Sequence, residues 1–191
     1  MNRLFDTRQE YGGGSIAIHW VVALVTLTLL VTGYVLLFMA RGPAKGDMIS
    51  FHTGIGWILA LLVIVRLLWR VINPLPRLLT GEPWENVLAR VVQWSMILLL
   101  VAFAVTGYLS VATSPRLQSV SVLGWFDLPK LNDLGRALHR GSEEVHLWIS
   151  HVFAAFLLLH VVGAVKRQFV DRDGTLRRMI WLRRIVPGAA G

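Results

Sequence analysis

Long stretches of the chain contain no charged residue, and they alternate with short segments in which the charges gather. The four longest stretches without Asp, Glu, Lys or Arg hold 30, 18, 25 and 21 residues and cover 11–40, 48–65, 91–115 and 145–165. About 20 predominantly apolar residues are needed to cross a bilayer as a helix. The pattern therefore predicts an all-α integral membrane four-helix bundle, with transmembrane helices at about 14–40, 49–71, 88–112 and 144–168.

Composition and length agree with one membrane domain. Apolar residues make up 55% of the 191 residues and charged residues 16%. The longest connection, 112–144, holds 33 residues and is too short to form a soluble domain. The first apolar stretch is long and has no small-residue cleavage site after a short apolar core, so we expect it to be retained rather than removed as a signal peptide.

The distribution of the charges that give the net charge of +8 is typical of a membrane protein rather than of a nucleic-acid-binding protein. If the N-terminus, the second connection and the C-terminus lie on one side, that side has 13 Lys and Arg against 6 Asp and Glu, and the other side has 6 against 5. The basic side of a membrane protein is usually the cytoplasmic one. We therefore expect both termini in the cytoplasm and no nucleic-acid partner.

Two histidines in the last apolar stretch, His146 and His160, lie fourteen residues apart. On a helix this spacing turns the second imidazole to within ~40° of the first and separates the two by ~21 Å along the axis. His19 and His52 lie at the starts of the first and second apolar stretches. One helix face thus offers two imidazoles at different depths, and each has a candidate partner on another helix.

Depth decides which histidines can pair. His19 and His160 lie near the cytoplasmic ends of their helices, whereas His52 and His146 lie near the outer ends. Each pair could hold one metal, and the set predicts two axial haem sites in which all four histidines are metal ligands. Because the chain has no cysteine, thiolate-bound clusters and covalent haem attachment are excluded, and two noncovalent haem b groups fit.

Other readings of these histidines remain. A lone intramembrane histidine more often forms a hydrogen bond between helices than binds a metal, and a set of them can form a haem-free proton pathway. Zinc is a competing metal, but ligands separated into pairs are too few for a structural zinc site. The matched depths of the four side chains favour haem.

Two arginines are further candidates for cofactor binding. Arg66 and Arg70 share a helix face near the expected depth of the inner haem, where they could pair with its propionates. Anchoring at the cytoplasmic side explains them equally well. Of the remaining histidines, His151 faces away from the paired positions and is expected to be a helix contact or pocket residue, and His139 a solvated loop residue.

The chain also repeats a motif at an offset of 74 residues. Thr32-Gly33-Tyr34 returns as Thr106-Gly107-Tyr108, and the residue fourteen before each glycine is His19 in the first copy and Gln93 in the second. Each of these two residues is followed by tryptophan. A duplicated helical hairpin would explain the repeat, with Gln93 at the position that His19 holds in the first copy.

Several motifs together resemble the bacterial cytochrome b561 family. They are Ile18-His19-Trp20, Phe51-His52-Thr53-Gly54-Ile55-Gly56, Arg66-Leu67-Leu68-Trp69-Arg70, Thr106-Gly107-Tyr108, Leu128-Pro129, Val145-His146, Leu159-His160 and the run from Asp171 to Met179. The resemblance covers about residues 8 to 179. It implies a multi-pass, four-helix di-haem b protein of the bacterial inner membrane that exchanges electrons with ubiquinone, and it places the haem ligands on the same four histidines. Many members have histidine where this chain has Gln93, Arg167 and Gln168.

The resemblance implies two alternative functions. One branch of the family oxidises periplasmic superoxide and reduces quinone, which favours a superoxide:quinone-type oxidoreductase. Another branch provides the haem b anchor and electron carrier for a partner hydrogenase or dehydrogenase, without independent catalysis. Lys130, Arg136 and Arg140 could attract superoxide. The apolar segment 120–126 could dock a periplasmic donor protein, or it could lie in the membrane interface.

Overall fold

The computed structural model describes residues 4–74, 76, 82–115, 120–122, 124–131 and 135–180. Its main elements are four long helices, α1 (Gly13–Phe38), α2 (Pro43–Ile72), α3 (Pro83–Ala112) and α4 (Gly135–Phe169). Each is long and apolar enough to cross a membrane. The predicted all-α membrane four-helix bundle is therefore confirmed.

Three helices begin several residues before the apolar stretches that identified them. α2 begins at Pro43 and α3 at Pro83. Proline suits the first helical turn because its fixed φ is already helical and its missing N–H would have no partner there. α4 begins at Gly135 rather than near 144. Charges mark where the bilayer ends, whereas a helix can continue into water beyond that point.

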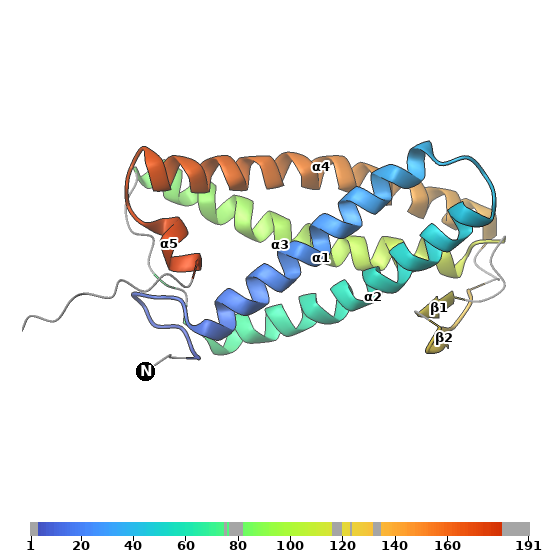
Figure 1. Ribbon diagram of the computed structural model, residues 1–191, viewed down its shortest axis with the longest axis horizontal. Helices are drawn as coiled ribbons and strands as arrows, with labels where there is room; N and C mark the ends of the chain where they lie inside the picture. Colours follow the sequence, from blue (N-terminus) through green and yellow to red (C-terminus); the bar gives the residue numbers. More distant parts are fainter. Residues whose placement is uncertain are drawn as a thin grey trace, which may run out of the picture.

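Helices adjacent in sequence pack against each other, α1 on α2, α2 on α3 and α3 on α4. The start of α1, the end of α2, the start of α3, the end of α4 and the short α5 (Thr175–Met179) all lie at one end of the bundle (Figure 1). We call it the terminal end. The opposite end, which we call the hairpin end, carries the α1–α2 connection and the strands β1 (Val120–Val122) and β2 (Phe126–Leu128).

The strands at the hairpin end were not expected from the apolar pattern. β1 and β2 pair antiparallel with Val122 opposite Phe126. Between them Gly124 has φ 76°, a left-handed conformation that favours glycine. β1 packs against α2. The apolar segment 120–126 is thus part of a small hairpin, and Trp125 in its turn is 82% exposed.

Polar contacts tie the terminal end together. Nζ of Lys166 on α4 lies 2.9 Å from Oε1 of Glu85 on α3 and 3.0 Å from Oδ2 of Asp171. Nε1 of Trp20 on α1 donates a 2.6 Å hydrogen bond to the carbonyl of Met179 at the end of α5. Exposed ion pairs contribute little stability singly. Their main effect here is to hold the chain that follows α4 against the bundle.

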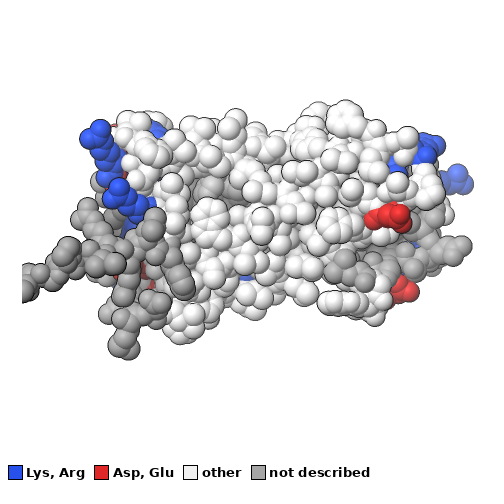
Figure 2. All heavy atoms as spheres, viewed as in Figure 1, with Lys and Arg blue, Asp and Glu red and all other residues white. Residues whose placement is uncertain are grey.

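One small apolar core joins all four helices. Its buried members are at most 5% exposed, and they are Val22, Leu59, Val63, Leu100 and Phe153. Many other large apolar side chains are exposed. On the face shown in Figure 2, the middle of the bundle is almost free of charge, and the charged side chains gather at the two ends. This is the surface expected of helices that face lipid.

Replacing Phe153 by alanine should destabilise the bundle. Its side chain is 1% exposed and packs on Phe103, with ring centroids 5.6 Å apart. Lipid is as apolar as the core, so the loss comes from packing and the residual cavity, and we expect about 1–3 kcal/mol. Thermal unfolding in detergent measures this. Leu158→Ala on the same helix, at a position 64% exposed, is the control, and equal stability of the two variants would contradict the central role of Phe153.

Candidate functional site

Four histidines form two facing pairs, one toward each end of the bundle. In the hairpin-end pair, His52 of α2 faces His146 of α4 with ring centroids 6.4 Å apart. In the terminal-end pair, His19 of α1 faces His160 of α4 at 6.2 Å. All four side chains are partly buried. The structure brings together the partners that helix depth predicted.

Packed aromatic side chains separate the two pairs. Phe153 lies seven residues after His146 and seven before His160 on α4, so the three side chains share one helix face. Phe103 of α3 contacts both His146, at a centroid distance of 5.1 Å, and Phe153, at 5.6 Å. The core of the bundle therefore lies between two separate imidazole sites.

Each histidine of the hairpin-end pair is held by a threonine. Oγ1 of Thr32 on α1 lies 2.8 Å from Nδ1 of His52. Oγ1 of Thr106 on α3 lies 2.9 Å from Nδ1 of His146. The two threonines are the first residues of the repeated Thr-Gly-Tyr motif, so both copies of the repeat perform the same task on different helices.

These contacts also favour the tautomer of each ring in which Nδ1 carries the proton. A threonine hydroxyl has one proton. Thr32 donates it to the carbonyl of Thr28 at 2.9 Å, and Thr106 to the carbonyl of Ala102 at 2.7 Å. The hydroxyl oxygen therefore accepts the N–H of Nδ1. Nε2 of each ring then carries no proton, which is the state in which an imidazole nitrogen binds a metal.

The glycines of the repeat leave room for the two rings. A Cβ placed on Gly33 would lie 3.3 Å from Cε1 of His52, and one on Gly107 would lie 3.2 Å from Cε1 of His146. The repeat is visible in the sequence, but its pattern predicted no role for the threonines. A signal for that role exists, because each threonine lies directly before the glycine and thirteen residues after His19 or Gln93.

The terminal-end pair lies beside arginine side chains instead. Nη2 of Arg66 on α2 lies 3.3 Å from Nδ1 of His19. The guanidinium of Arg70, one turn later, lies 5.2 Å from the ring centroid of Trp94. Nε and Nη2 of Arg70 are shut off from solvent and have no hydrogen-bond partner among the described residues. Buried cationic donors without an acceptor are costly, so this end suits an anionic group.

The other two histidines lie outside the pairs. His151 is exposed on α4, with Nδ1 2.8 Å from the carbonyl of Leu147, and its ring meets Tyr34 of α1 edge to face. The prediction for His139 is wrong. It lies in α4 rather than in a solvated loop, its side chain is only 12% exposed, and its Nδ1 lies 2.9 Å from the carbonyl of Ser110. The early start of α4 turns His139 toward α3.

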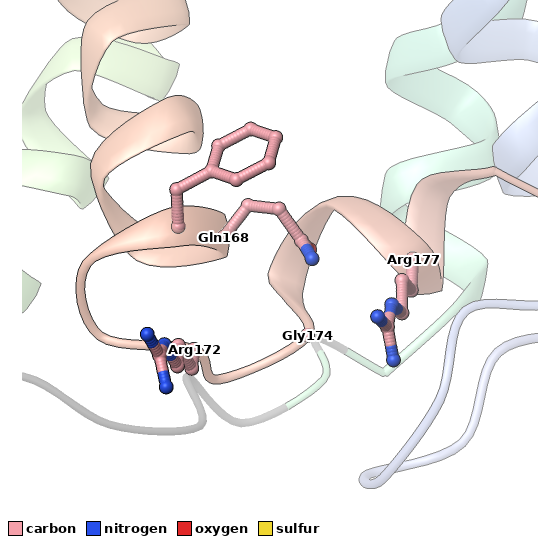
Figure 3. Close-up of a pocket in the computed structure, with 5 residues that line it drawn as sticks. Gln168, Arg172, Gly174 and Arg177 are labelled. Atoms are coloured by element: carbon pink, nitrogen blue, oxygen red, sulfur yellow. The ribbon is translucent and has the colours of Figure 1, made fainter.

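A cavity lies at each end of the bundle. One of about 240 Å³ at the hairpin end is lined by Pro115, Arg136, His139 and Arg140. Lys130, the third cation expected there, is instead hydrogen-bonded to the carbonyl of Ser114 at 2.5 Å. The other cavity, of about 380 Å³, lies where α4 turns into α5, and Figure 3 shows its lining, Gln168, Phe169, Arg172, Gly174 and Arg177. Both cavities are basic, and the paired histidines line neither of them.

The spacing within each pair suits a metal ion held by two imidazoles. Metal–nitrogen bonds of about 2.0–2.1 Å, with each ring centre ~1.1 Å behind its bonding nitrogen, separate two ring centroids by about 6.3 Å. The observed separations are 6.2 and 6.4 Å. Within the described residues no three His, Cys, Asp or Glu side chains gather. A metal at these pairs would need its other ligands from a macrocycle such as haem.

A membrane four-helix bundle with facing histidines at two levels is the architecture of a membrane cytochrome b. Comparison with known proteins gives the family. Residues 10–181 match the model of the prokaryotic cytochrome b561 family. The chain is also similar to cytochrome b561 homolog 2 of Escherichia coli (strain K12), with 31% identity over 184 residues that cover 92% of this chain and 93% of that protein.

The chain therefore belongs to the prokaryotic cytochrome b561 family. It is a multi-pass protein of the bacterial inner membrane that transfers electrons through haem b.

Replacing Gly107 by alanine should disturb the hairpin-end pair. The added Cβ would press on Cε1 of His146 at 3.2 Å and tilt its ring away from His52. We expect lower haem content and an altered reduced-minus-oxidised spectrum in the purified protein. Gly46→Ala on α2 is the control, because a Cβ there has no neighbour within 4 Å. Haem content and spectrum equal to those of the control would show that the ring tolerates the displacement.

Proposed function

We propose that the chain holds two haem b groups, one at each histidine pair. His52 and His146 would hold the haem at the hairpin end, and His19 and His160 would hold the haem at the terminal end. The observation that carries this proposal is the centroid separation within both pairs, 6.4 and 6.2 Å. Bound haem supplies reversible one-electron chemistry. Iron held by two histidines at each site would favour electron transfer over oxygen activation.

Arg66 and Arg70 hold the haem propionates at the terminal end. Arg66 lies beside His19, and Arg70 has buried N–H groups that lack an acceptor among the described residues. A propionate carboxylate is an acceptor that a guanidinium binds with paired, charge-assisted hydrogen bonds. These arginines thereby position the cofactor in addition to anchoring α2 at the membrane surface.

The terminal end faces the cytoplasm, and the hairpin end faces the periplasm. The supporting observation is the charge of the sequence, because the N-terminal segment, the second connection and the C-terminal segment together hold 13 Lys and Arg against 6 Asp and Glu, and the other two connections hold 6 against 5. Basic residues accumulate on the cytoplasmic side. Electrons then enter from the periplasm at the hairpin-end pair.

Superoxide is the proposed donor and ubiquinone the acceptor. Two superoxide anions each give up one electron and become dioxygen, and one ubiquinone takes these two electrons and two protons to become ubiquinol. The hairpin-end cavity, with Arg136 and Arg140 in its lining, suits a small anion. Cationic walls raise the local concentration of an anion and increase its rate of encounter.

A second candidate function is that of an electron carrier for a periplasmic partner protein. The observation that favours it is the hairpin at the same end, where Trp125 is 82% exposed and Phe126 55% exposed. Exposed aromatic side chains are typical anchors in protein interfaces. In this case the partner performs the catalysis, and the chain passes its electrons to ubiquinone.

Purified protein should contain two haem b groups per chain, neither covalently attached. His52→Ala should remove one spectral component and His19→Ala the other, because each substitution takes one axial ligand from a different pair. His151→Ala is the matched control, since that imidazole is exposed on α4 and outside both pairs. Haem extraction and redox difference spectra measure the outcome. A single haem, or loss of the same component in both variants, would show that the pairing is not the ligand arrangement.

Superoxide should reduce the protein and support quinone reduction without a partner, at a rate that falls as salt screens the cavity. Arg136→Glu and Arg140→Glu should each slow the reaction several-fold. Arg41→Glu, an equal charge change at an exposed hairpin-end residue outside the cavity lining, should have a smaller effect. Stopped-flow absorbance of the haems measures these rates. If ubiquinol reduces the haems but superoxide does not, the carrier function is the correct one.

A further inference from the structure

The two histidine pairs have opposite polar surroundings. At the hairpin end, Oγ1 of Thr32 and of Thr106 lies 2.8 and 2.9 Å from Nδ1 of His52 and His146, where it can accept a hydrogen bond from the ring tautomer that leaves Nε2 free to bind a metal. At the terminal end, a cationic group, Nη2 of Arg66, lies 3.3 Å from Nδ1 of His19. At the hairpin-end pair, a neutral hydroxyl oxygen therefore lies beside each histidine. At the terminal-end pair, a positively charged guanidinium lies beside His19.

A hydrogen bond from Nδ1 to an acceptor makes an imidazole a stronger electron donor toward a metal at Nε2. The effect is reinforced here, because each threonine hydroxyl gives its own proton to a backbone carbonyl, that of Thr28 or Ala102. An electron-rich ligand stabilises the oxidised form of the metal. Both threonines should therefore lower the reduction potential of the hairpin-end site.

Arg66 acts in the opposite direction. Its guanidinium is permanently charged, and its surroundings are only partly accessible to solvent, where charges interact more strongly than in water. Even when it is paired with a propionate, the guanidinium makes the site beside His19 less negative than it would be without Arg66, and this favours the form that carries the additional electron. Arg66 should therefore raise the reduction potential of the terminal-end site.

We propose that Thr32, Thr106 and Arg66 are positioning and tuning residues that order the two haem potentials, with the hairpin-end haem lower and the terminal-end haem higher. Electrons then run downhill from the hairpin end to the terminal end. This inference rests on the proposed two-haem function, and it assigns a purpose to the repeated Thr-Gly-Tyr motif. The rings of one pair are oriented by neutral oxygens, and the rings of the other lie beside a cation.

The test is a spectroscopic redox titration of the purified two-haem protein, with His52→Ala used to identify the hairpin-end component. Thr32→Val and Thr106→Val keep the shape of the side chain and remove its oxygen, so each should shift the hairpin-end potential upward and leave the other unchanged. Thr32→Ser and Thr106→Ser should restore the wild-type value. Thr28→Val is the matched control, because Thr28 bonds to the carbonyl of Leu24 in the same helix and touches no histidine in any described hydrogen bond.

Substitution of Arg66 tests the other half of the proposal. Arg66→Gln removes the charge and should shift the terminal-end potential downward, whereas Arg66→Lys should keep it near the wild-type value. Haem content per chain is measured for every variant, so that a lost haem is distinguished from a shifted one. If the valine variants lose the haem, Thr32→Cys and Thr106→Cys replace them, and a weaker sulfur acceptor should give a smaller upward shift.

The outcomes separate this inference from the proposed function. Wild-type protein with fewer than two haems would overturn the two-haem function, and the tuning with it. Two haems in the wild type, with threonine variants whose potentials equal that of Thr28→Val, would overturn the tuning alone. A hairpin-end potential above the terminal-end potential in the wild type would also overturn it.

Discussion

Polar atoms inside a bilayer need partners, and in this bundle neighbouring helices supply them to three of the four paired imidazoles, through Thr32, Thr106 and Arg66. The facing rings keep 6.2 and 6.4 Å between their centroids. α4 therefore meets α1 and α2 through histidines at two levels, whereas the extensive helix packing is between sequence neighbours. Phe153 packs in the core between the two histidine pairs. The placement of the helices follows from these three sets of contacts, which are the two pairs and the core around Phe153.

The four long helices contribute unequally to the sites. α1, α2 and α4 carry the paired histidines, and α3 carries none of them. α3 instead supplies Thr106, which bonds to His146, and Phe103, which packs between the levels. The glutamine at 93, where the first copy of the repeat has His19, fits this division. α1 supplies His19 together with Thr32, which supports His52, whereas α3 supplies support alone.

Much of this arrangement could be predicted from sequence, because charges cannot lie in the bilayer and helix depth limits which histidines can meet. The four spans and both pairs follow from these two facts. The limits of the same reasoning appear outside the membrane. The lengths of the uncharged stretches do not reveal how far α4 extends beyond the membrane, so His139 was wrongly predicted to lie in a loop. The apolar pattern also did not reveal the pairing of β1 with β2. Contacts such as that of Arg66 with His19 depend on helix rotation, which hydropathy does not define. The ligand role of the histidines stays a prediction.

The spacing of His146 and His160 on α4 has a consequence for energy conversion. Fourteen residues of helix separate the two levels by ~21 Å, which is about two thirds of a ~30 Å hydrocarbon core. A full crossing of the membrane changes the energy of one charge by about 2.3 kcal/mol per 100 mV. With one haem at each level, as proposed, transfer of an electron between them would be electrogenic, at about 1.5 kcal/mol per 100 mV. Its rate would then depend on the voltage of the membrane that contains the protein.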